Sequence, residues 1–347
     1  MEKNPLVSII ILNFNAGDLL VNCIESIKKS NYSNYEIILV DNASTDNSIT
    51  LCKTKFPKIT YIQNDKNLGY SEGNNIGVHH AQGDYIAILN PDTLVKPDWL
   101  DELILGYRTF GEGLYQPKLL SIDDKTRINT AGNMVQLFGF GFSRGKGEKD
   151  TGQYDSLHKI GFASGACLFT AKTVFDKLGG FEPFLFAYNE DMDLGWRAAK
   201  IGIDSYFIAS AVVYHAESYS HKWSATKFFL LEQNRLYCIL THYSLGTRIK
   251  LAPFFVLTEL ALLFYFASKK MLKQKIRAYS SIIRNKKYIA KKRVESEKYR
   301  MITDRELIKR FVDKLYVPED VSSRLYNKIF NAYLSFQAKI FRVFVNT

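Results

Sequence analysis

The first ninety residues alternate short apolar runs, rich in β-branched residues, with segments of helical periodicity. The four runs are VSIIILN, EIILVDN, ITYIQN and YIAILN. Between the first two runs, one apolar stripe recurs every three to four residues, at Leu19, Leu20, Cys23, Ile24 and Ile27. Short buried strands in alternation with helices are typical of a mostly parallel sheet that is covered on both faces. The sequence therefore predicts an α/β fold.

Polar residues stand where each predicted strand ends. They form pairs along the chain: Asn13 and Asn15, Asp41 and Asn42, Asn64 and Asp65, and Asn90 and Asp92. In an open parallel sheet, ligands bind in the crevice beyond the carboxyl ends of the strands. A carboxylate at this edge can accept the imide N–H of a uracil or thymine ring, which is the role we expect for Asp41. Asp46 is explained more simply as a cap of the next helix.

A glycine-rich segment follows the third predicted strand. Gly69, Gly73 and Gly77 recur every four residues and lie beside Asn67 and Asn74. These glycines could let a helix pack tightly against the sheet, or could admit a ribose and a diphosphate close to the backbone. No GxGxxG pattern follows the first strand, which disfavours a dinucleotide-dependent oxidoreductase.

The composition indicates where in the cell the protein is located and what it could bind. Of the 347 residues, 46% are hydrophobic, which is enough for a large core. The four cysteines lack CxxC spacing and no signal peptide is recognisable, so we expect reduced thiols in a cytosolic protein. The formal net charge of +11 is compatible with nucleic acid, a membrane surface or an anionic substrate. The basic residues concentrate after about Lys269 without a nucleic-acid recognition motif, so we expect no nucleic-acid partner.

The pattern changes after Phe110. The segment GEGLYQPKLL is irregular, and FGFGFSRGKGEKDTGQYD is predicted to be a mobile loop or a hairpin over the sheet. Regular structure then returns as a strand and a helix in GACLFTAKTVFDKLGG, a helix in NEDMDLGWRAAKIG that ends at Gly202, and a strand in DSYFIASAVVYH. We expect one domain over residues 1–243, with halves at 1–110 and 111–243, and a helical region over 244–347.

The C-terminal region contains LAPFFVLTELALLFYFAS, residues 251–268. This run is borderline in length for a membrane span, and the central Glu259 counts against one. A basic tract follows it, so we expect a helix that lies in the surface of an anionic membrane. The alternative is a packed helix of a soluble C-terminal bundle.

Two acidic segments could carry chemistry. Asp92 can bind Mg²⁺ or Mn²⁺, which would neutralise a leaving diphosphate, or it can simply belong to a turn before the next helix. In the second segment, an acidic first turn with Asp193 facing Arg197 is a complete structural explanation. The adjacent carboxylates Glu190 and Asp191 can also supply a general base, because crowding and partial burial raise a carboxyl pKa. Local sequence does not separate these readings.

These motifs, in this order, resemble the family 2 glycosyltransferases with the GT-A fold, and within them the rhamnosyltransferase-like branch. The resemblance runs from about Val7 to about Tyr243, through VSIIILNFN, ILVDNASTDNS, NLGYSEGNNIG, LNPDT, the NED segment and VVYHAESYS. It implies a Rossmann-like, mostly parallel sheet flanked by helices. It also implies transfer of a sugar from a nucleotide-activated donor, with inversion at the anomeric carbon.

The resemblance assigns roles by motif position. Asp191 would be the general base, with Glu190 beside it. The nucleotide-sugar site would comprise Asn13, Asn15, Asp41, Asn67, Gly69, Asn74, Asn90, Asp92 and Arg197. Asp92 and the late histidine His215 would hold the metal, and Trp196 would line the acceptor site. Arg197 could instead bind only Asp193, and Asn234 and Arg235 are lesser candidates for the diphosphate. The family's metal motif has an aspartate where this chain has Asn90, so the site keeps its geometry and loses one charge.

We therefore expect an inverting, metal-dependent glycosyltransferase. The donor would be a UDP- or dTDP-sugar, with dTDP-rhamnose first, and the acceptor a glycan or a lipid-linked oligosaccharide. The enzyme would be peripheral at the cytosolic face of the cell membrane. One alternative is a sugar-nucleotide nucleotidyltransferase, although LNFNAGD offers no basic phosphate loop. The other is a catalytically silent glycan-binding or scaffold protein of the same fold.

Overall fold

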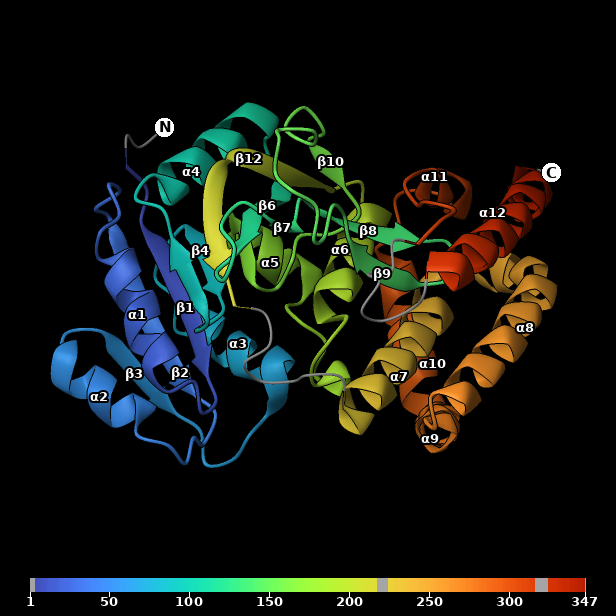
Figure 1. The fold of residues 1–347 in the computed structure, drawn as a ribbon, viewed down its shortest axis with the longest axis horizontal. Helices are drawn as coiled ribbons and strands as arrows, with labels where there is room; N and C mark the ends of the chain where they lie inside the picture. Colours follow the sequence, from blue (N-terminus) through green and yellow to red (C-terminus); the bar gives the residue numbers. More distant parts are fainter. Residues whose placement is uncertain (1–3, 217–223, 316–323, 347) are drawn as a thin grey trace. The chain divides into compact units, whose positions relative to one another are not determined.

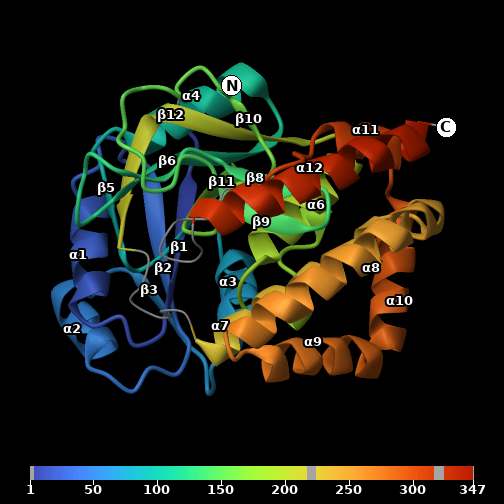
Figure 2. The same ribbon diagram turned by 45° about the vertical axis from the view of Figure 1, so that its right-hand side comes forward.

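The computed structural model describes residues 4–216, 224–315 and 324–346. The chain divides into two compact units, and most of each is visible in Figures 1 and 2. Unit 1 consists of Met1–Asn133, Ser143–Ala198 and Ile203–Lys222. Unit 2 consists of Met134–Phe142, Ala199–Gly202 and Trp223–Thr347.

A sheet of ten strands runs through unit 1, in the order β10-β12-β6-β11-β4-β1-β2-β3, with β5 beside β12 and β7 beside β6. The strands are β1 (Val7–Asn13), β2 (Tyr35–Asp41), β3 (Thr60–Gln63), β4 (Tyr85–Leu89), β5 (Thr93–Val95), β6 (Gly113–Ser121), β7 (Ile128–Thr130), β10 (Lys159–Ile160), β11 (Cys167–Ala171) and β12 (Asp204–His215). The four predicted strands β1 to β4 are mutually parallel where they pair. β6 and β12 also pair in parallel, and β11 joins the two parallel groups in antiparallel pairing. The predicted α/β fold is confirmed.

Helices cover both faces of this sheet. They are α1 (Asp18–Ile27), α2 (Ser48–Lys55), α3 (Gly69–His79), α4 (Trp99–Phe110), α5 (Lys172–Leu178) and α6 (Glu190–Lys200), with the short 3-10 helix η1 (Pro183–Leu185) before α6. Side chains of α1, α2 and α4 share one core with Ile9 and Ile11 of β1. Helix α3 lies on the opposite face, because a Cβ on Gly77 would come within 2.4 Å of the Ile10 side chain. The glycines of α3 therefore allow the close packing that the sequence suggested.

Two segments were predicted less well. The sequence analysis left Gly113–Ser121 irregular, but this segment is β6, a nearly fully buried strand inside the sheet. Its flanking glycines and Pro117 broke the strand pattern, and pairing with β12 on one side and β11 on the other overrides those local preferences. The predicted loop or hairpin over 138–155 contains only the strand β9 (Phe140–Ser143), which pairs with β8 (Asn133–Gln136) before it.

Unit 2 is mainly helical. Its helices are α7 (Ala225–His242), α8 (Leu245–Ser268), α9 (Leu272–Arg284), α10 (Lys286–Lys298), α11 (Asp304–Lys309) and α12 (Arg324–Asn346). Figure 2 shows α8 and α12 side by side, and Phe254 of α8 contacts Phe341 and Phe344 of α12. By length and composition alone, α8 could cross a membrane, but the core helix of a soluble protein passes the same test.

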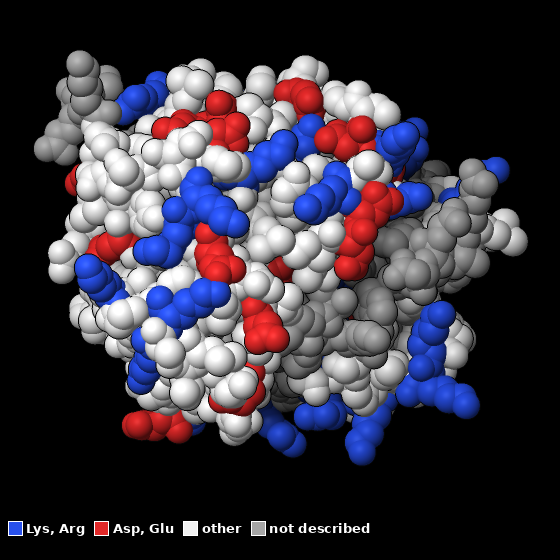
Figure 3. Space-filling view, turned by 60° about the vertical axis from the view of Figure 1, so that its left-hand side comes forward, with Lys and Arg blue, Asp and Glu red and all other residues white. Residues whose placement is uncertain are grey.

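Charged side chains are distributed unevenly along the chain. On the face drawn in Figure 3, lysine and arginine side chains are interspersed with aspartate and glutamate. Lysine and arginine far outnumber aspartate and glutamate after residue 244. The excess positive charge of the protein is therefore carried mainly by the sequence of unit 2.

Four buried charges meet in the interior of unit 2. The Arg235 guanidinium pairs with the carboxylates of Glu232 and Glu259, and the Lys275 ammonium pairs with the same two carboxylates. The Tyr279 hydroxyl donates a hydrogen bond of 2.5 Å to Glu259. Burial alone would raise the pKa of Glu259, but the Arg235 and Lys275 charges outweigh burial and lower it to about 2. Two acids and two bases thus neutralise each other in the interior of unit 2.

Replacing one acid of this network should destabilise unit 2. In Glu259→Gln the two cations keep their burial and lose one of their two counter-charges, so we expect the free energy of unfolding to fall by about 3–5 kcal/mol. Urea denaturation followed by circular dichroism measures the change. Glu295→Gln is the matched control, because Glu295 is exposed, 3.8 Å from Lys292, and should change stability by less than about 0.5 kcal/mol.

The same network makes the stability of the folded protein fall at acidic pH. The pKa of Glu259 is lowered from 4.5 to about 2, so its contribution to stability is complete above about pH 4.5. That contribution is lost as the pH falls from there towards 2, where the folded protein also takes up the proton. Equal acid sensitivity in the wild type and in Glu259→Gln would contradict this assignment.

Candidate active site

The end of β4 and the end of β12 meet at one edge of the sheet. β4 ends at Leu89, and Pro91 lacks the N–H that would continue its hydrogen-bond ladder. The chain then passes through Asp92 into β5, which pairs with β12 so that Thr93 lies opposite His215. Asp92 and His215, which are far apart in sequence, are thus adjacent because the three-residue strand β5 follows the turn and pairs with β12.

Three of the residues predicted for the metal site lie together here. Nε2 of His215 is 3.4 Å from Oδ1 of Asp92 and 3.5 Å from Nδ2 of Asn90, and Nδ1 of His215 is 3.2 Å from Oδ1 of Asn129. Asp92 is buried, and its Oδ1 has no hydrogen-bond partner among the described residues. A buried carboxylate oxygen beside an imidazole and an amide is a donor set that suits Mg²⁺ or Mn²⁺.

The second acidic segment begins α6. The backbone before it has positive φ at Phe186 (62°), Tyr188 (68°) and Asn189 (63°), a conformation that costs energy for residues other than glycine. Backbone strain of this kind collects at functional sites. The segment with positive φ leads directly into α6. Glu190 and Asp191 therefore lie in the first turn of α6, where the helix dipole favours negative charge.

The two carboxyl groups have different environments. Burial raises the pKa of Asp191 to about 6, against the hydrogen bonds that Oδ2 accepts from Gly165 N (3.0 Å) and Oδ1 from Met192 N (2.8 Å). Burial, followed by the charge of Asp191, raises the pKa of Glu190 well above its ordinary value. A pKa of about 6 leaves Asp191 mainly ionised at neutral pH, so it can accept a proton, and burial beside Asp191 disfavours the charged form of Glu190.

One loop joins the two acidic sites. Gly165 N–H donates to Asp191, and the next residue, Ala166, accepts a hydrogen bond of 3.0 Å from Asn90 N–H through its carbonyl. The Tyr70 hydroxyl, from α3, donates 2.5 Å to the Gly165 carbonyl. Asp191 and the Asn90 turn are thus fixed to neighbouring residues of the segment that leads into β11.

The pKa of the Tyr70 hydroxyl is affected by carboxylates of both acidic sites. It is raised well above its ordinary value by burial, and further by the charges of Glu190, Asp191 and Asp92. Both acidic sites therefore act on a single buried hydroxyl. Sequence reasoning missed Tyr70, as it missed Gly165 and Asn129, because their roles arise from contacts across more than eighty residues.

The Asp41 carboxylate is bound within the protein. It is buried and accepts four hydrogen bonds: from Asn13 Nδ2 and Ser44 Oγ at Oδ1, and from Ser44 N and Gln63 Nε2 at Oδ2. Each carboxylate oxygen thus already has two donors, which is about its full capacity. Gln63 is exposed, so it is the donor that a base would have to displace.

The other residues predicted to line the nucleotide are used mainly within the protein. Oδ1 of Asn15 accepts a hydrogen bond from Thr45 N, and Oδ1 of Asn67 accepts one from Gly69 N. Asn74 is buried, and its Oδ1 has no hydrogen-bond partner among the described residues. Among the residues predicted to line the nucleotide, Asn74 thus has a buried acceptor atom to which a ligand could donate a hydrogen bond.

Gly69 has a steric explanation. Its φ is +80°, and a Cβ there would lie 2.5 Å from both the ring and the carbonyl oxygen of Phe186. Ser71 N–H donates to that same carbonyl, at 3.1 Å. The start of α3 therefore rests directly against the strained segment before Asp191.

Two predicted residues of α6 have structural contacts instead. The Trp196 ring is fully buried, so it does not present a surface to an acceptor in this structure. Arg197 pairs with Asp193 at 2.7 Å and donates to the Leu178 carbonyl, which is the structural role that its spacing allowed. The proposed acceptor contact of Trp196 is thus not supported by its position.

Arg235, a lesser candidate for the diphosphate, belongs to the buried ion network of unit 2, and Asn234 beside it is also buried.

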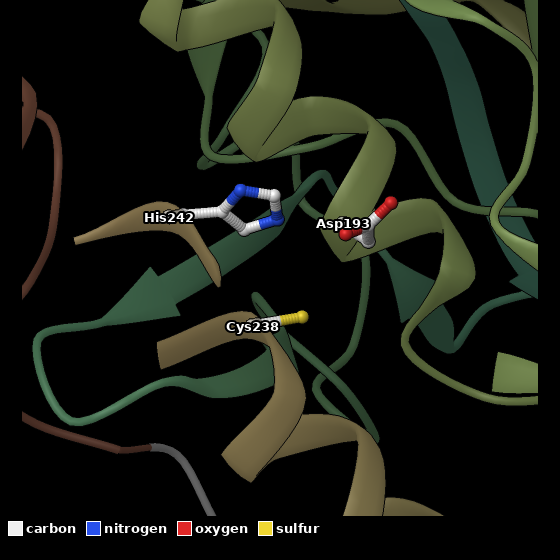
Figure 4. Close-up of side chains that lie close together, drawn as sticks. All are labelled: Asp193, Cys238 and His242. Atoms are coloured by element: carbon white, nitrogen blue, oxygen red, sulfur yellow. The ribbon is translucent and has the colours of Figure 1, made fainter. Parts of the chain in front are cut away.

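Figure 4 labels Asp193 on α6 of unit 1, and it labels Cys238 and His242, which lie one turn apart on α7 of unit 2.

Comparisons with known proteins show similarity to glycosyltransferases. Residues 8–179 match the model of glycosyl transferase family 2. The uncharacterized protein y4gI of Sinorhizobium fredii is 31% identical over 234 residues, which cover 63% of this chain and 25% of that protein. An N-acetylglucosaminyl-diphospho-decaprenol L-rhamnosyltransferase of Mycobacterium tuberculosis is 23% identical over 237 residues, covering 62% of this chain and 77% of that protein.

A solved structure, GalNAc-T7 with UDP, GalNAc and Mn²⁺, is similar in fold, with a TM-score of 0.56 and 16% identity. The similarity covers 70% of this chain and 48% of that one. The mostly parallel sheet flanked by helices, together with this likeness, defines a GT-A type fold. Residues 8–179 of the chain are similar to the glycosyl transferase family 2 model. The chain spans only about a quarter of the rhizobial relative.

Proposed function

We propose that this chain transfers a sugar from a nucleotide-activated donor to a hydroxyl group of a glycan or lipid-linked acceptor, with inversion at the anomeric carbon. One observation carries the proposal: the Asp92–His215 site and the Asp191 carboxylate are both fixed to the loop at Gly165 and Ala166. A metal-binding group and a proton acceptor at one sheet edge are what displacement of a nucleoside diphosphate by a hydroxyl requires.

Asp191 is the group that takes the proton. As the acceptor oxygen attacks the anomeric carbon, its proton passes to a carboxylate oxygen of Asp191, and the bond to the diphosphate breaks on the opposite side. A pKa of about 6 keeps Asp191 ionised at pH 7 and makes it a stronger base than an exposed aspartate. Burial and the charge of Asp191 disfavour a second negative charge on Glu190 beside it.

A divalent cation held by Asp92, with His215 and Asn90 as further ligands, would neutralise the negative charge that develops on the leaving diphosphate. The GalNAc-T7 structure contains Mn²⁺, which makes Mn²⁺ the first ion to test and Mg²⁺ the second. Asn90 contributes an amide oxygen where a second carboxylate would add charge, so we expect this site to bind the ion less tightly than a two-aspartate site.

For the donor we propose dTDP-rhamnose first and UDP-sugars next. The support is the Asn90–Pro91–Asp92 motif of the rhamnosyltransferase-like branch and the name of the M. tuberculosis relative. That relative acts, by its name, on a diphospho-decaprenol, which favours a lipid-linked acceptor.

The test is a panel of nucleotide sugars with and without Mn²⁺ or Mg²⁺, monitored by nucleoside diphosphate release. We expect release from one donor, greatest with a metal ion and increased by a polyprenyl-diphosphate-linked sugar. Release of pyrophosphate instead would indicate a nucleotidyltransferase. Binding of glycans without turnover of any donor would indicate a silent protein of the same fold.

We also propose that residues 244–347 hold the protein at the cytosolic face of an anionic membrane, where a lipid-linked acceptor would lie. The support is the excess of lysine and arginine in this region together with the apolar run at 251–268.

Removing the Tyr70 hydroxyl should change how Asp191 titrates. In Tyr70→Phe the ring keeps its packing, but Gly165 loses its anchor, and the Gly165 N–H bond that lowers the pKa of Asp191 weakens. We expect the acidic limb of the kcat/KM profile to move about one pH unit above the wild-type position near 6. Tyr115→Phe is the matched control, because Tyr115 also donates to a glycine carbonyl, that of Gly111, in the core on the other face of the sheet. Equal profiles for the two variants would contradict this role.

A further inference from the structure

Helix α8 buries polar side chains at its centre and exposes a series of large apolar ones. Its central polar residues, Thr258 and Glu259, are 0% and 7% exposed. Its exposed large hydrophobic residues are Leu245, Ile249, Val256, Leu257, Leu260 and Phe264. This set is named the α8 outer face here. Phe264 is 78% exposed, the reverse of what a surface helix of a soluble protein shows.

The inner side of α8 is fixed by specific polar contacts. Glu259 pairs with Arg235 and Lys275, and the Thr258 hydroxyl lies 2.9 Å from Gln337 Oε1 of α12. Rotating α8 to bury its apolar side would separate these partners and leave two cations buried with a single carboxylate. The outer face therefore remains outward.

Basic side chains border the α8 outer face at both ends. Lys250 is exposed near the start of the helix, and Lys269, Lys270 and Lys273 are exposed just beyond its last turn. The neighbouring helix α12 repeats the pattern, with exposed apolar residues at Ile329, Phe336 and Val343 and exposed lysines at Lys328 and Lys339. An apolar strip with lysines around it matches the layered chemistry of an anionic bilayer surface.

We propose that the α8 outer face lies in the headgroup region of an anionic lipid bilayer, with the helix axis along the membrane surface. This inference deepens the membrane contact of the proposed function by assigning it to one face of one helix. Burial of Glu259 in its network excludes a span that would expose all sides of α8 to lipid. A second copy of the chain is a poorer occupant, because the lysines at each end of one α8 would meet like charges on the other.

Vesicle flotation of the full-length protein tests the proposal. We expect binding to vesicles of phosphatidylglycerol and phosphatidylcholine in equal parts, and little binding to phosphatidylcholine alone. Leu260→Ser combined with Phe264→Ser should weaken binding at least about tenfold, because both side chains leave water on binding. Leu105→Ser, in α4 of unit 1, is the matched control, since Leu105 is 56% exposed and should not matter.

The lysines have their own test. Lys269→Gln with Lys273→Gln should weaken binding to the anionic vesicles about tenfold or more and should flatten its salt dependence. Lys53→Gln with Lys58→Gln, both exposed in unit 1, should leave binding unchanged.

Three results would overturn the inference: unchanged binding in the apolar double variant, equal binding to neutral vesicles, or a wild-type dimer that the variant converts to a monomer. The apolar variant should keep wild-type nucleoside diphosphate release with a soluble acceptor. Vesicle binding without turnover of any donor would reject the proposed reaction but would still support membrane binding through the α8 outer face. Turnover without vesicle binding would reject the α8 face alone.

Discussion

Asp191→Asn should lower the rate of sugar transfer about 10³-fold, the largest effect that we expect from a single substitution in this chain. A general base contributes about 10²- to 10⁴-fold, and an amide cannot take the acceptor proton at neutral pH. Asparagine keeps the size of the side chain and one acceptor oxygen for Gly165 N–H, so the donor should still bind. Initial rates with saturating donor, and donor affinity by calorimetry, separate the two effects.

Glu190→Gln is the control for this substitution. Burial and the charge of Asp191 raise the pKa of Glu190 well above its ordinary value, which favours the protonated form that glutamine resembles. We expect less than about a tenfold loss. In the wild type the rate should also fall below about pH 6, as Asp191 takes up a proton, and should fall tenfold for each further pH unit. A Glu190→Gln defect as large as that of Asp191→Asn would reverse the two roles.

The second large effect concerns Asp92. Asp92→Ala removes the buried carboxylate that would bind the metal ion, so we expect transfer to fall at least about 100-fold and Mn²⁺ affinity to fall with it. Calorimetric titration of Mn²⁺ in the presence of the nucleoside diphosphate measures affinity independently of turnover. Asn90→Asp is the matched variant, because it adds one carboxylate at the same site and should tighten Mn²⁺ binding.

Stability distinguishes this role from a structural one. Oδ1 of Asp92 is buried without a hydrogen-bond partner among the described residues, so the folded protein gains little from it. Asp92→Ala should therefore leave the melting temperature equal or higher while transfer is lost. Loss of both stability and transfer would mean that Asp92 supports the fold instead.

The apolar stripe of α1 and the apolar runs of the buried strands β1, β2 and β4 predicted these elements. Strand β3 was also predicted, although none of its residues is fully buried. Periodicity missed β6, where burial between two strands outweighs glycine and proline in the sequence. The grouping of Asn90, Asp92 and His215 was foreseen only through resemblance to a family, since β5 and β12 bring them together across more than 120 residues.

Side-chain partners were harder to foresee. Two of the four donors to Asp41, those of Asn13 and Gln63, depend on the register that sets both residues opposite it in the paired strands, and no local pattern encodes that register. The apolar run at 251–268 was predicted to lie at a membrane surface, but which side of the helix would be outward depends on where Arg235 and Lys275 lie.

The division of the chain into units limits how the protein can be dissected. Unit 2 includes residues 134–142 and 199–202 as well as the C-terminal helices, so the backbone passes between the units five times. Tyr243 donates a hydrogen bond to the Leu137 carbonyl, and Arg235 donates one to Phe138, so the internal segment 134–142 is part of the fold of unit 2. A truncation after residue 243 would leave that segment and α7 behind, with Arg235 and Glu232 deprived of Glu259 and Lys275. Point substitutions in the whole chain, rather than deletions, are the appropriate way to separate catalysis from membrane binding.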